Sequence, residues 1–176
     1  TAYLYALREA MAEKGILVDS LVSADARVSE SEMTHALFTV ESEPLRKVLG
    51  EMMKPSQNQM AEIFLKTIGL ETTGVGSADS GLRTVRTKMR EWGVADDGWA
   101  LRDGSGLTRN NFISPESIAR ILSAMKQHEL FPVFFESLPI AGVDGTLRSR
   151  MTGTPAANNL RGKTGTLARA SAMSGY

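Results

Sequence analysis

The sequence predicts an α+β chain, in which a series of helices is followed by a β-hairpin. Apolar side chains recur at helical spacing through most of residues 41–138. Residues 139–160 contain glycine and proline throughout, as is typical of loops. Residues 162–176 show the pattern of two short strands joined by a turn near residues 168–170. Helices and strands are therefore segregated along the chain, which is the arrangement of an α+β fold.

The composition excludes several classes of protein. Basic and acidic side chains number 20 each, so no nucleic-acid or anionic-membrane partner is indicated. No cysteine is present, so we expect no disulfide framework, thiol nucleophile or thiolate metal site. The apolar fraction of 42% is ordinary for a globular protein, and no apolar run is long enough to span a bilayer. The amphipathic pattern that starts at Thr1 does not resemble a signal peptide.

The first 55 residues are expected to contain two helices. Residues 1–15 place apolar side chains on one stripe, and Gly15 is a plausible C-terminal stop. Residues 15–28 alternate loosely and are rich in valine, which predicts a short strand or an extended link. A second helix is expected to start near Pro44 and to end before Pro55, because the residue before proline avoids helical angles.

Three serines are expected to cap the helices that follow. Ser56, Ser80 and Ser114 each stand directly before an apolar stripe, where a side-chain oxygen can accept a hydrogen bond from a free backbone N–H. Gly69 and Gly93 are the expected stops of the first two of these helices. Proline follows Ser114, as is common in a first helical turn.

The second strand of the hairpin is expected to be interrupted by the end of the chain. An outer strand that ends so early would leave an open sheet edge, which folded domains avoid. We therefore expect this chain to be a segment of a longer protein or one of two complementary chains.

Several candidate sites are interpreted as structural. Ser123 and Lys126 match a Ser-x-x-Lys pattern, but they lie on an ordinary amphipathic helix. Gly74-Val75-Gly76 follows no strand, so a loop is expected rather than a dinucleotide site. His35 and His128 are far apart and have no further ligand at metal spacing, so solvated or capping roles are expected. No metal or organic cofactor is predicted.

The Ser56-Gln57-Asn58 segment carries the first indication of chemistry. A hydroxyl and a carboxamide two residues apart at a helix start would lie side by side in a cleft. In amide hydrolysis such a hydroxyl can relay a proton to the leaving amine, while the carboxamide holds a substrate carbonyl. Capping and catalysis by Ser56 are compatible at this stage.

The Lys163-Thr164-Gly165-Thr166 segment would complete the substrate-facing part of such a site. The lysine and the threonine hydroxyls can bind a substrate carboxylate. Gly165 allows close approach of another backbone, and the Thr166 N–H can point at a developing oxyanion. Ser-x-Asn followed about a hundred residues later by Lys-Thr-Gly is the order found in penicillin-recognising enzymes.

Longer stretches make the resemblance specific. The segments SEPLRKVLGEMMKPSQNQMAEIFLKTIG, DGSGLTRNNFISP, LPIAGVDGTLRSRM and GKTGTLARASAMSGY resemble the D-alanyl-D-alanine carboxypeptidase/endopeptidase family of low-molecular-mass penicillin-binding proteins, the DacB-like S13 peptidases. The resemblance implies a β-lactamase/transpeptidase-like fold, an antiparallel sheet covered by helices beside a helical lobe. Residues 1–176 would be the C-terminal portion of that domain, incomplete in this chain. The helical lobe would span about 41–138, with sheet elements over about 1–40 and 139–176.

The same resemblance implies an exported, periplasmic or extracellular bacterial enzyme that needs no cofactor. Its partners would be peptidoglycan stem peptides ending in D-Ala-D-Ala and β-lactam antibiotics. Ser56, Asn58 and Lys163 match the catalytic motifs, Thr164, Gly165 and Thr166 the substrate-binding ones, and Gln57 departs from the family's usual aspartate. The polar residues of DGSGLTRNN and the Asp144-Gly145-Thr146 turn are expected to serve mainly as scaffold.

The family's nucleophile is the serine of a Ser-x-x-Lys motif that lies upstream of Ser-x-Asn, before large inserted domains. The resemblance places this chain after those insertions, so the chain alone is expected to be inactive. Two alternatives stay open: a β-lactamase of the same fold, and a catalytically inactive module that binds cell wall or another protein. The sequence upstream of Thr1 would discriminate between enzyme and module.

Overall fold

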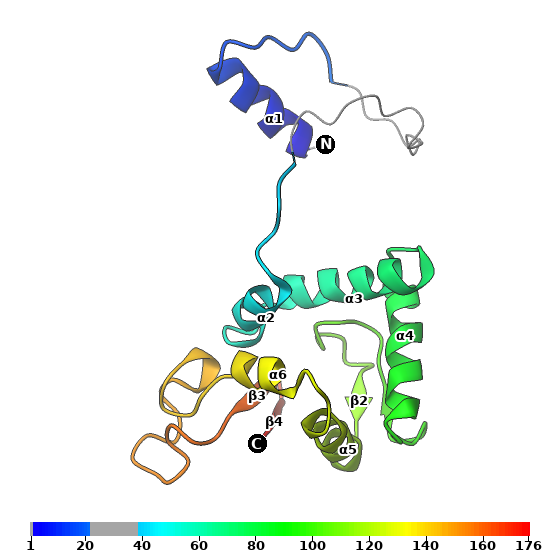
Figure 1. The fold of residues 1–176 in the computed structure, drawn as a ribbon, viewed down its shortest axis with the longest axis vertical. Coiled ribbons are helices and arrows are strands. Elements are labelled where there is room, and N and C mark those ends of the chain that lie inside the picture. Colours follow the sequence, from blue (N-terminus) through cyan, green and yellow to red (C-terminus); the bar gives the residue numbers. More distant parts are fainter. Residues whose placement is uncertain (1, 22–38) are drawn as a thin grey trace. The chain divides into compact units, whose positions relative to one another are not determined.

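The computed structural model describes residues 2–21 and 39–176, which divide into two parts, 1–42 and 43–176 (Figure 1). In the first part, helix α1 (Ala2–Glu13) is followed by Gly15 at φ +75°, which confirms the predicted helix and its stop. Residues 16–21 contain no strand, in keeping with an extended link over this part of the segment. The rest of the predicted strand segment lies outside the described residues.

Three helices open the second part: α2 (Leu45–Met53), α3 (Asn58–Thr73) and α4 (Ala78–Glu91) (Figure 1). The prediction that Gly69 ends α3 is wrong. The helix continues to a C-cap at Gly74, which has the left-handed φ of 73° that glycine adopts without strain. Gly69 instead faces α4, where a Cβ atom would lie 2.8 Å from the Gly81 backbone nitrogen. The glycine therefore permits a close helix crossing.

The prediction that Ser80 caps α4 is also wrong. The N-cap is Ser77, whose Oγ accepts a hydrogen bond of 3.2 Å from the Ser80 backbone N–H. Ser80 lies inside the first turn and is 1% exposed, and its hydroxyl bonds to Ser77 and Arg83. Ser80 packs against Gly69 of α3, and this burial places it inside the helix instead of at its start.

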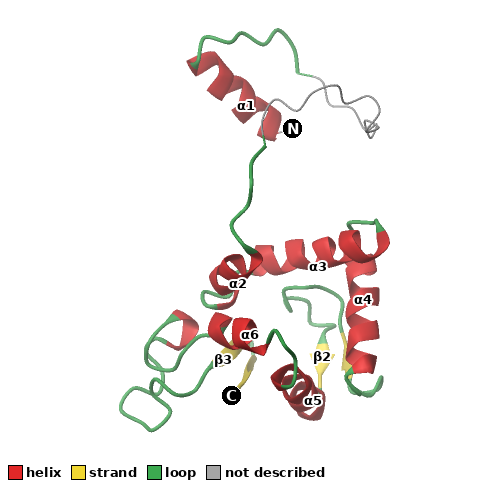
Figure 2. Cartoon of the chain, viewed as in Figure 1, coloured by secondary structure: helices red, strands yellow, loops and turns green. Residues whose placement is uncertain are grey.

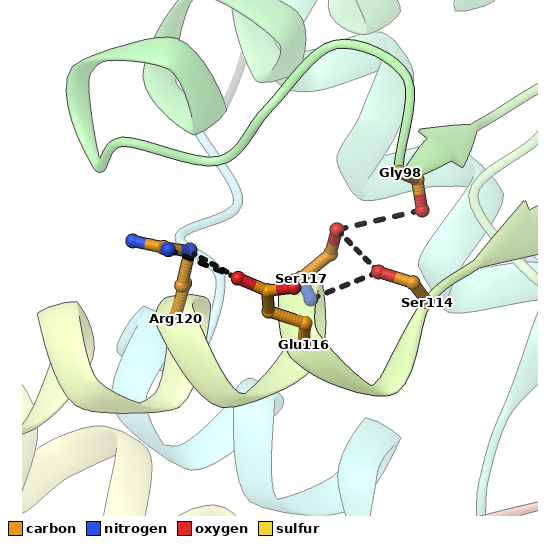
Figure 3. A network of polar contacts seen from close by, with 5 residues as sticks. All are labelled: Gly98, Ser114, Glu116, Ser117 and Arg120. Atoms are coloured by element: carbon orange, nitrogen blue, oxygen red, sulfur yellow. Dashed lines mark hydrogen bonds and ion pairs between the residues drawn. The ribbon is translucent and has the colours of Figure 1, made fainter.

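A small β-hairpin and a correctly predicted cap follow α4. Strands β1 (Trp99–Ala100) and β2 (Phe112–Ile113) pair antiparallel, and Trp99 packs with other buried side chains. Helix α5 (Pro115–Lys126) begins at Ser114, whose Oγ accepts a 3.1 Å bond from the Ser117 N–H. Figure 3 shows the Ser117 hydroxyl between Ser114 Oγ and the Gly98 carbonyl oxygen. The cap thereby ties α5 to the start of β1.

Helix α6 (Phe131–Ser137) was not predicted, because seven residues are too few to show a helical repeat of apolar side chains. It packs against α2. A long loop containing the short 3-10 helix η2 (Gly145–Leu147) then leads to β3 (Gly162–Leu167) and β4 (Ala170–Gly175). The hairpin and its turn confirm the prediction for this segment.

Tyr176 anchors the end of the hairpin to the helices. Its hydroxyl donates a 2.6 Å bond to the Leu122 carbonyl oxygen of α5, and its ring packs edge-on against Phe131 of α6. The described residues therefore form an α+β chain that is mostly helical with two small sheets (Figure 2). The division into a helical lobe and flanking sheet elements stays a prediction.

Candidate active site

The structure brings Ser56 and Lys163 together. Lys163, the second residue of β3, donates a 2.6 Å hydrogen bond from Nζ to Ser56 Oγ, across 107 residues of sequence. A second bond of 2.7 Å runs from Nζ to the Thr164 carbonyl oxygen. Burial lowers the pKa of the Lys163 ammonium from 10.5, because the charged form loses hydration. The two predicted motifs thus meet at one half-buried cation.

Ser56 does not cap α3, which corrects the sequence-based interpretation. Gln57 occupies the N-cap position, and no side chain there makes a capping bond. Ser56 itself has φ +65°, in the left-handed region that is costly for residues with a Cβ atom. The Oγ atom therefore serves the contact with Lys163 rather than the helix start.

Asn58 is the first residue of α3 and is exposed. Only Gln57 separates Asn58 from Ser56, so the Asn58 carboxamide and the Ser56 hydroxyl belong to the same short segment. An exposed carboxamide at the start of a helix can offer both a donor and an acceptor to an incoming amide.

The pairing of β3 with β4 determines where its backbone groups point. Arg161 and Tyr176 exchange two backbone bonds, N–H to O at 2.9 and 2.8 Å. Pairs in an antiparallel ladder alternate, so Thr164 and Thr166, opposite Met173 and Ser171, are non-hydrogen-bonded positions. Their N–H and C=O groups therefore point away from β4, toward the other edge of β3.

This edge of β3 is accessible around Gly165. Gly165 and Thr166 are exposed, and a Cβ atom built on Gly165 would meet nothing within 4 Å. In the part of the chain that the structure describes, Gly162 N–H bonds to the Pro139 carbonyl oxygen at this edge, and no backbone group pairs with Thr164 or Thr166 there. An extended peptide can therefore approach this stretch, the free edge of β3, without meeting a side chain at Gly165.

Two further contacts join β3 to the segment before Ser56 through Thr146, which the sequence predicted only as part of a scaffold turn. The Thr164 hydroxyl donates a 2.8 Å bond to Thr146 Oγ1. Thr146 N–H donates a 3.0 Å bond to the Lys54 carbonyl oxygen, and the Lys54 ammonium pairs with the Asp144 carboxylate. The signal in the sequence was Asp-Gly-Thr, a turn that exposes a hydroxyl and a carboxylate at fixed spacing.

The candidates interpreted as structural lie elsewhere. Ser123 and Lys126 are exposed on α5. His128 accepts a 3.2 Å bond from the Leu130 N–H in the turn between α5 and α6 and caps neither helix, whereas His35 lies outside the described residues. Across residues 2–21 and 39–176, no group of three His, Cys, Asp or Glu side chains forms a metal site. No helix in the same ranges is long and apolar enough to cross a membrane.

The sequence matches known proteins along nearly its whole length. A model of the D-Ala-D-Ala carboxypeptidase 3 (S13) family matches residues 2–176. The D-alanyl-D-alanine carboxypeptidase of Actinomadura sp. is 35% identical over 173 residues, which are 96% of this chain and 32% of that protein. The carboxypeptidase DacB of Haemophilus influenzae is 31% identical over 138 residues, 77% of this chain and 29% of that protein.

Solved structures agree with these matches. Penicillin-binding protein 4 (DacB) of H. influenzae superposes with a TM-score of 0.71 at 31% identity, covering 76% of this chain and 30% of that one. The same protein has also been solved in complex with a β-lactam. A predatory endopeptidase of Bdellovibrio bacteriovorus shares the fold, with a TM-score of 0.60 at 20% identity. The chain spans about a third of the length of the curated relatives it matches.

Proposed function

Because the chain belongs to the D-Ala-D-Ala carboxypeptidase 3 (S13) family, we propose that it supplies the substrate-facing half of a serine peptidase site. The substrate would be a peptidoglycan peptide ending in D-Ala-D-Ala, cleaved by carboxypeptidase or endopeptidase action. The observation that carries the proposal is the 2.6 Å hydrogen bond from Lys163 Nζ to Ser56 Oγ, beside the free edge of β3.

That hydrogen bond assigns a direction to proton transfer. A protonated Lys163 can only donate, so the Ser56 oxygen accepts from it and the serine keeps its own hydrogen for another partner. Ser56 would give this proton to the departing D-alanine amine and recover one from the attacking serine through its neighbouring groups. The positive charge of Lys163 would also attract the substrate's terminal carboxylate.

The free edge of β3 would hold the peptide. The Thr166 N–H, which points away from β4, would donate to the carbonyl oxygen as negative charge develops there. Asn58 would orient the acylated peptide through its exposed carboxamide, and the hydroxyls of Thr164 or Thr166 would assist in binding the terminal carboxylate. Gly165 would leave room for the substrate backbone.

The nucleophile in this proposal is a serine from outside the chain. Ser123 heads the only Ser-x-x-Lys pattern of the sequence, but it is exposed on α5 and follows Ser56 in chain order. The external serine, activated by its own lysine, would attack the carbonyl carbon between two D-alanines. The C–N bond breaks, D-alanine leaves with the proton from Ser56, and water hydrolyses the resulting ester. The surrounding sheet would then be that of a complete transpeptidase-like fold.

We also place this activity outside the cytoplasmic membrane, where peptidoglycan peptides and β-lactams are encountered. β-Lactams would acylate the same serine, since a β-lactam carries both an amide bond and a carboxylate suited to Lys163. Two similar proteins, a DacB solved with a β-lactam and a penicillin-sensitive carboxypeptidase of Dictyostelium discoideum, support the proposed acylation by β-lactams.

The test uses the complete protein that carries this chain, with its upstream Ser-x-x-Lys segment. Incubation with labelled penicillin should give a stable covalent adduct, and a peptide ending in D-Ala-D-Ala should release D-alanine. Ser123→Ala is the matched control and should change neither. The 176-residue chain alone should not be labelled. Labelling at Ser123 would contradict the assignment, rapid turnover of penicillin would indicate a β-lactamase, and a folded protein without adduct or D-alanine release would indicate an inactive module.

A further inference from the structure

We propose that Thr146 is a positioning residue, which holds the Ser56 hydroxyl in register with Lys163 by bonding to both segments of the site. The inference rests on the proposed function and adds to it a residue that lies outside the Ser-x-Asn and Lys-Thr-Gly motifs. Within the described residues, no hydrogen bond joins Thr146 directly to Ser56 or Lys163. It acts through their chain neighbours, Lys54 and Thr164.

The contacts form a closed ring. From Ser56 the chain runs back through Pro55 to Lys54, whose carbonyl oxygen accepts the 3.0 Å bond from Thr146 N–H. Thr146 Oγ1 accepts the 2.8 Å bond from Thr164, and Thr164 is bonded covalently to Lys163. The 2.6 Å bond from Lys163 back to Ser56 closes the ring.

The ring holds β3 on both of its faces. Successive side chains of a strand point to opposite faces, so Lys163 and Thr164 leave β3 in opposite directions. One binds Ser56 and the other binds Thr146, which is fixed to the same short segment as Ser56. A rotation or slide of β3 that preserved one of these contacts would break the other.

The turn that carries Thr146 is itself fixed against Lys54. Gly145 has φ +54°, and a Cβ atom on it would lie 2.5 Å from the Lys54 carbonyl oxygen, so only glycine allows this approach. The Asp144 carboxylate pairs with the Lys54 ammonium through one oxygen. Its other oxygen accepts a 2.8 Å bond from the Ile140 N–H. The turn that carries the Thr146 hydroxyl is therefore held against Lys54 by three contacts, one each from Asp144, Gly145 and Thr146.

The backbone conformation of Ser56 requires stabilisation by its surroundings. Its left-handed backbone costs on the order of 1–3 kcal/mol and persists only where the surroundings fix it. No cap on α3 contributes, since Gln57 makes no capping bond. Among the described residues, Ser56 is held by the Lys163 bond, by the fixed Lys54 segment and by a 2.9 Å bond from the Gln57 N–H to the Met52 carbonyl oxygen. Thr146 connects the first two of these contacts.

The experiment compares three threonine variants in the complete protein. Thr146→Val removes the hydroxyl while keeping the shape, and should slow acylation by labelled penicillin about tenfold, with a lower kcat and little change in KM for peptide. Thr146→Ser restores the hydroxyl and should recover the rate to within about twofold. Thr87→Val is the matched control, because among the described residues its hydroxyl bonds within α4 alone, to the Arg83 carbonyl oxygen.

A second readout does not depend on activity. NMR titration of labelled lysine should show the pKa of Lys163 rising toward 10.5 in Thr146→Val, because a loosened ring lets water reach the ammonium, and remaining unchanged in Thr87→Val. If Thr146→Val fails to fold, Asp144→Asn, which weakens the same support, replaces it in both measurements. An unchanged acylation rate together with an unchanged Lys163 pKa overturns the inference.

The two measurements also separate this inference from the proposed function. If the wild-type protein is folded but is neither acylated nor active, the proposed function fails, and the Lys163 titration alone decides the role of Thr146. If the wild-type protein is acylated and Thr146→Val behaves like Thr87→Val, the function stands and the positioning role is wrong.

Discussion

Lys163 donates its 2.6 Å hydrogen bond to a serine whose backbone lies in the left-handed region, at φ +65°. The bond joins the short segment between α2 and α3 to strand β3, two elements that are distant in sequence. Ser56 thus combines strained backbone, no capping role and a charged partner. Such a combination is typical of a residue held in place for chemistry rather than for helix stability.

Replacing Ser56 by alanine should separate function from folding. In the complete protein, Ser56→Ala should reduce acylation by labelled penicillin by about a hundredfold or more, because the proton relay is lost. The melting temperature should change little, since the Oγ atom caps no helix. Acylation kinetics and thermal unfolding of the same preparation check this prediction.

Ser77→Ala is the matched control for Ser56→Ala. It removes a real N-cap, the bond from Ser80 N–H to Ser77 Oγ, and should lower the free energy of unfolding by about 1 kcal/mol without changing the acylation rate. A large loss of stability in Ser56→Ala with acylation intact would show that Ser56 is structural.

The lowered pKa of Lys163 predicts an alkaline limit on activity. Below that pKa the ammonium holds its positive charge beside Ser56, and above it the charge is lost, so the acylation rate should fall at a pH below 10.5. The unfolded chain binds this proton more tightly than the folded one, so the Lys163 contribution to stability rises with pH through the same window. Rate and stability should therefore change in opposite directions there.

Lys163→Arg tests whether this residue sets the alkaline limit. Arginine stays protonated throughout the measured range, so the variant should have a lower rate because of its different shape, but no fall in that rate near the Lys163 pKa. An alkaline limb that persists unchanged in Lys163→Arg would assign the limit to another group. A pH series of acylation rates, with folding monitored at each pH, provides the measurement.

The crossing of α3 and α4 should be intolerant of any added side chain at Gly69. A Cβ atom there would lie 2.8–2.9 Å from backbone and side-chain atoms of α4 and its cap, so Gly69→Ala should cost about 1–3 kcal/mol of unfolding free energy. Gly50→Ala in α2 is the control: a Cβ atom there meets nothing within 4 Å. That variant should be neutral or more stable by up to about 1 kcal/mol. Chemical denaturation of both variants measures these changes in the free energy of unfolding.

The ion pair of Lys54 with Asp144 should lose its effect in acid. Burial opposes ionisation of Asp144, but the Lys54 hydrogen bond, the Ile140 N–H and the charges of Lys54 and Arg161 outweigh it, so its pKa lies below 3.8. A carboxylate with a lowered pKa contributes stability that is present above pH 3.8 and is lost as the pH falls through the folded-state value. Asp144→Asn should therefore be less stable than wild type near neutral pH.

The difference in melting temperature between Asp144→Asn and wild type should shrink as the pH falls below 3.8. Asp96→Asn is the comparison variant, because it breaks the exposed pair with Arg90, and exposed pairs contribute little. A melting-temperature difference for Asp144→Asn that stays constant across this range would contradict the assigned ion pair.

Local signals in the sequence predicted several elements correctly. Gly15 and Gly93 follow α1 and α4 with positive φ, Ser114 caps α5, and the C-terminal hairpin turns where expected. Each of these features depends on a few neighbouring residues, such as a glycine free to adopt a left-handed backbone or a serine beside unpaired N–H groups.

The errors arose where packing chose between two local possibilities. Gly69 and Gly74 were both able to end α3, and Ser77 and Ser80 both to cap α4. The close approach of the two helices decided these cases, since it needs a glycine inside α3 and buries Ser80. The local sequence of one helix does not show which residues of the other helix pack against it.

The candidate site divides in the same way. The sequence by itself determined its chemistry: a hydroxyl and a carboxamide in Ser56-x-Asn58, and a cation with hydroxyls and a flexible strand position in Lys163-Thr164-Gly165-Thr166. Only the tertiary structure decided that Ser56 faces Lys163 instead of capping α3, and that Thr146 links their neighbours. The reason is physical. Residue types fix which bonds a side chain can make, whereas its partner is fixed by segments far along the chain that fold against it.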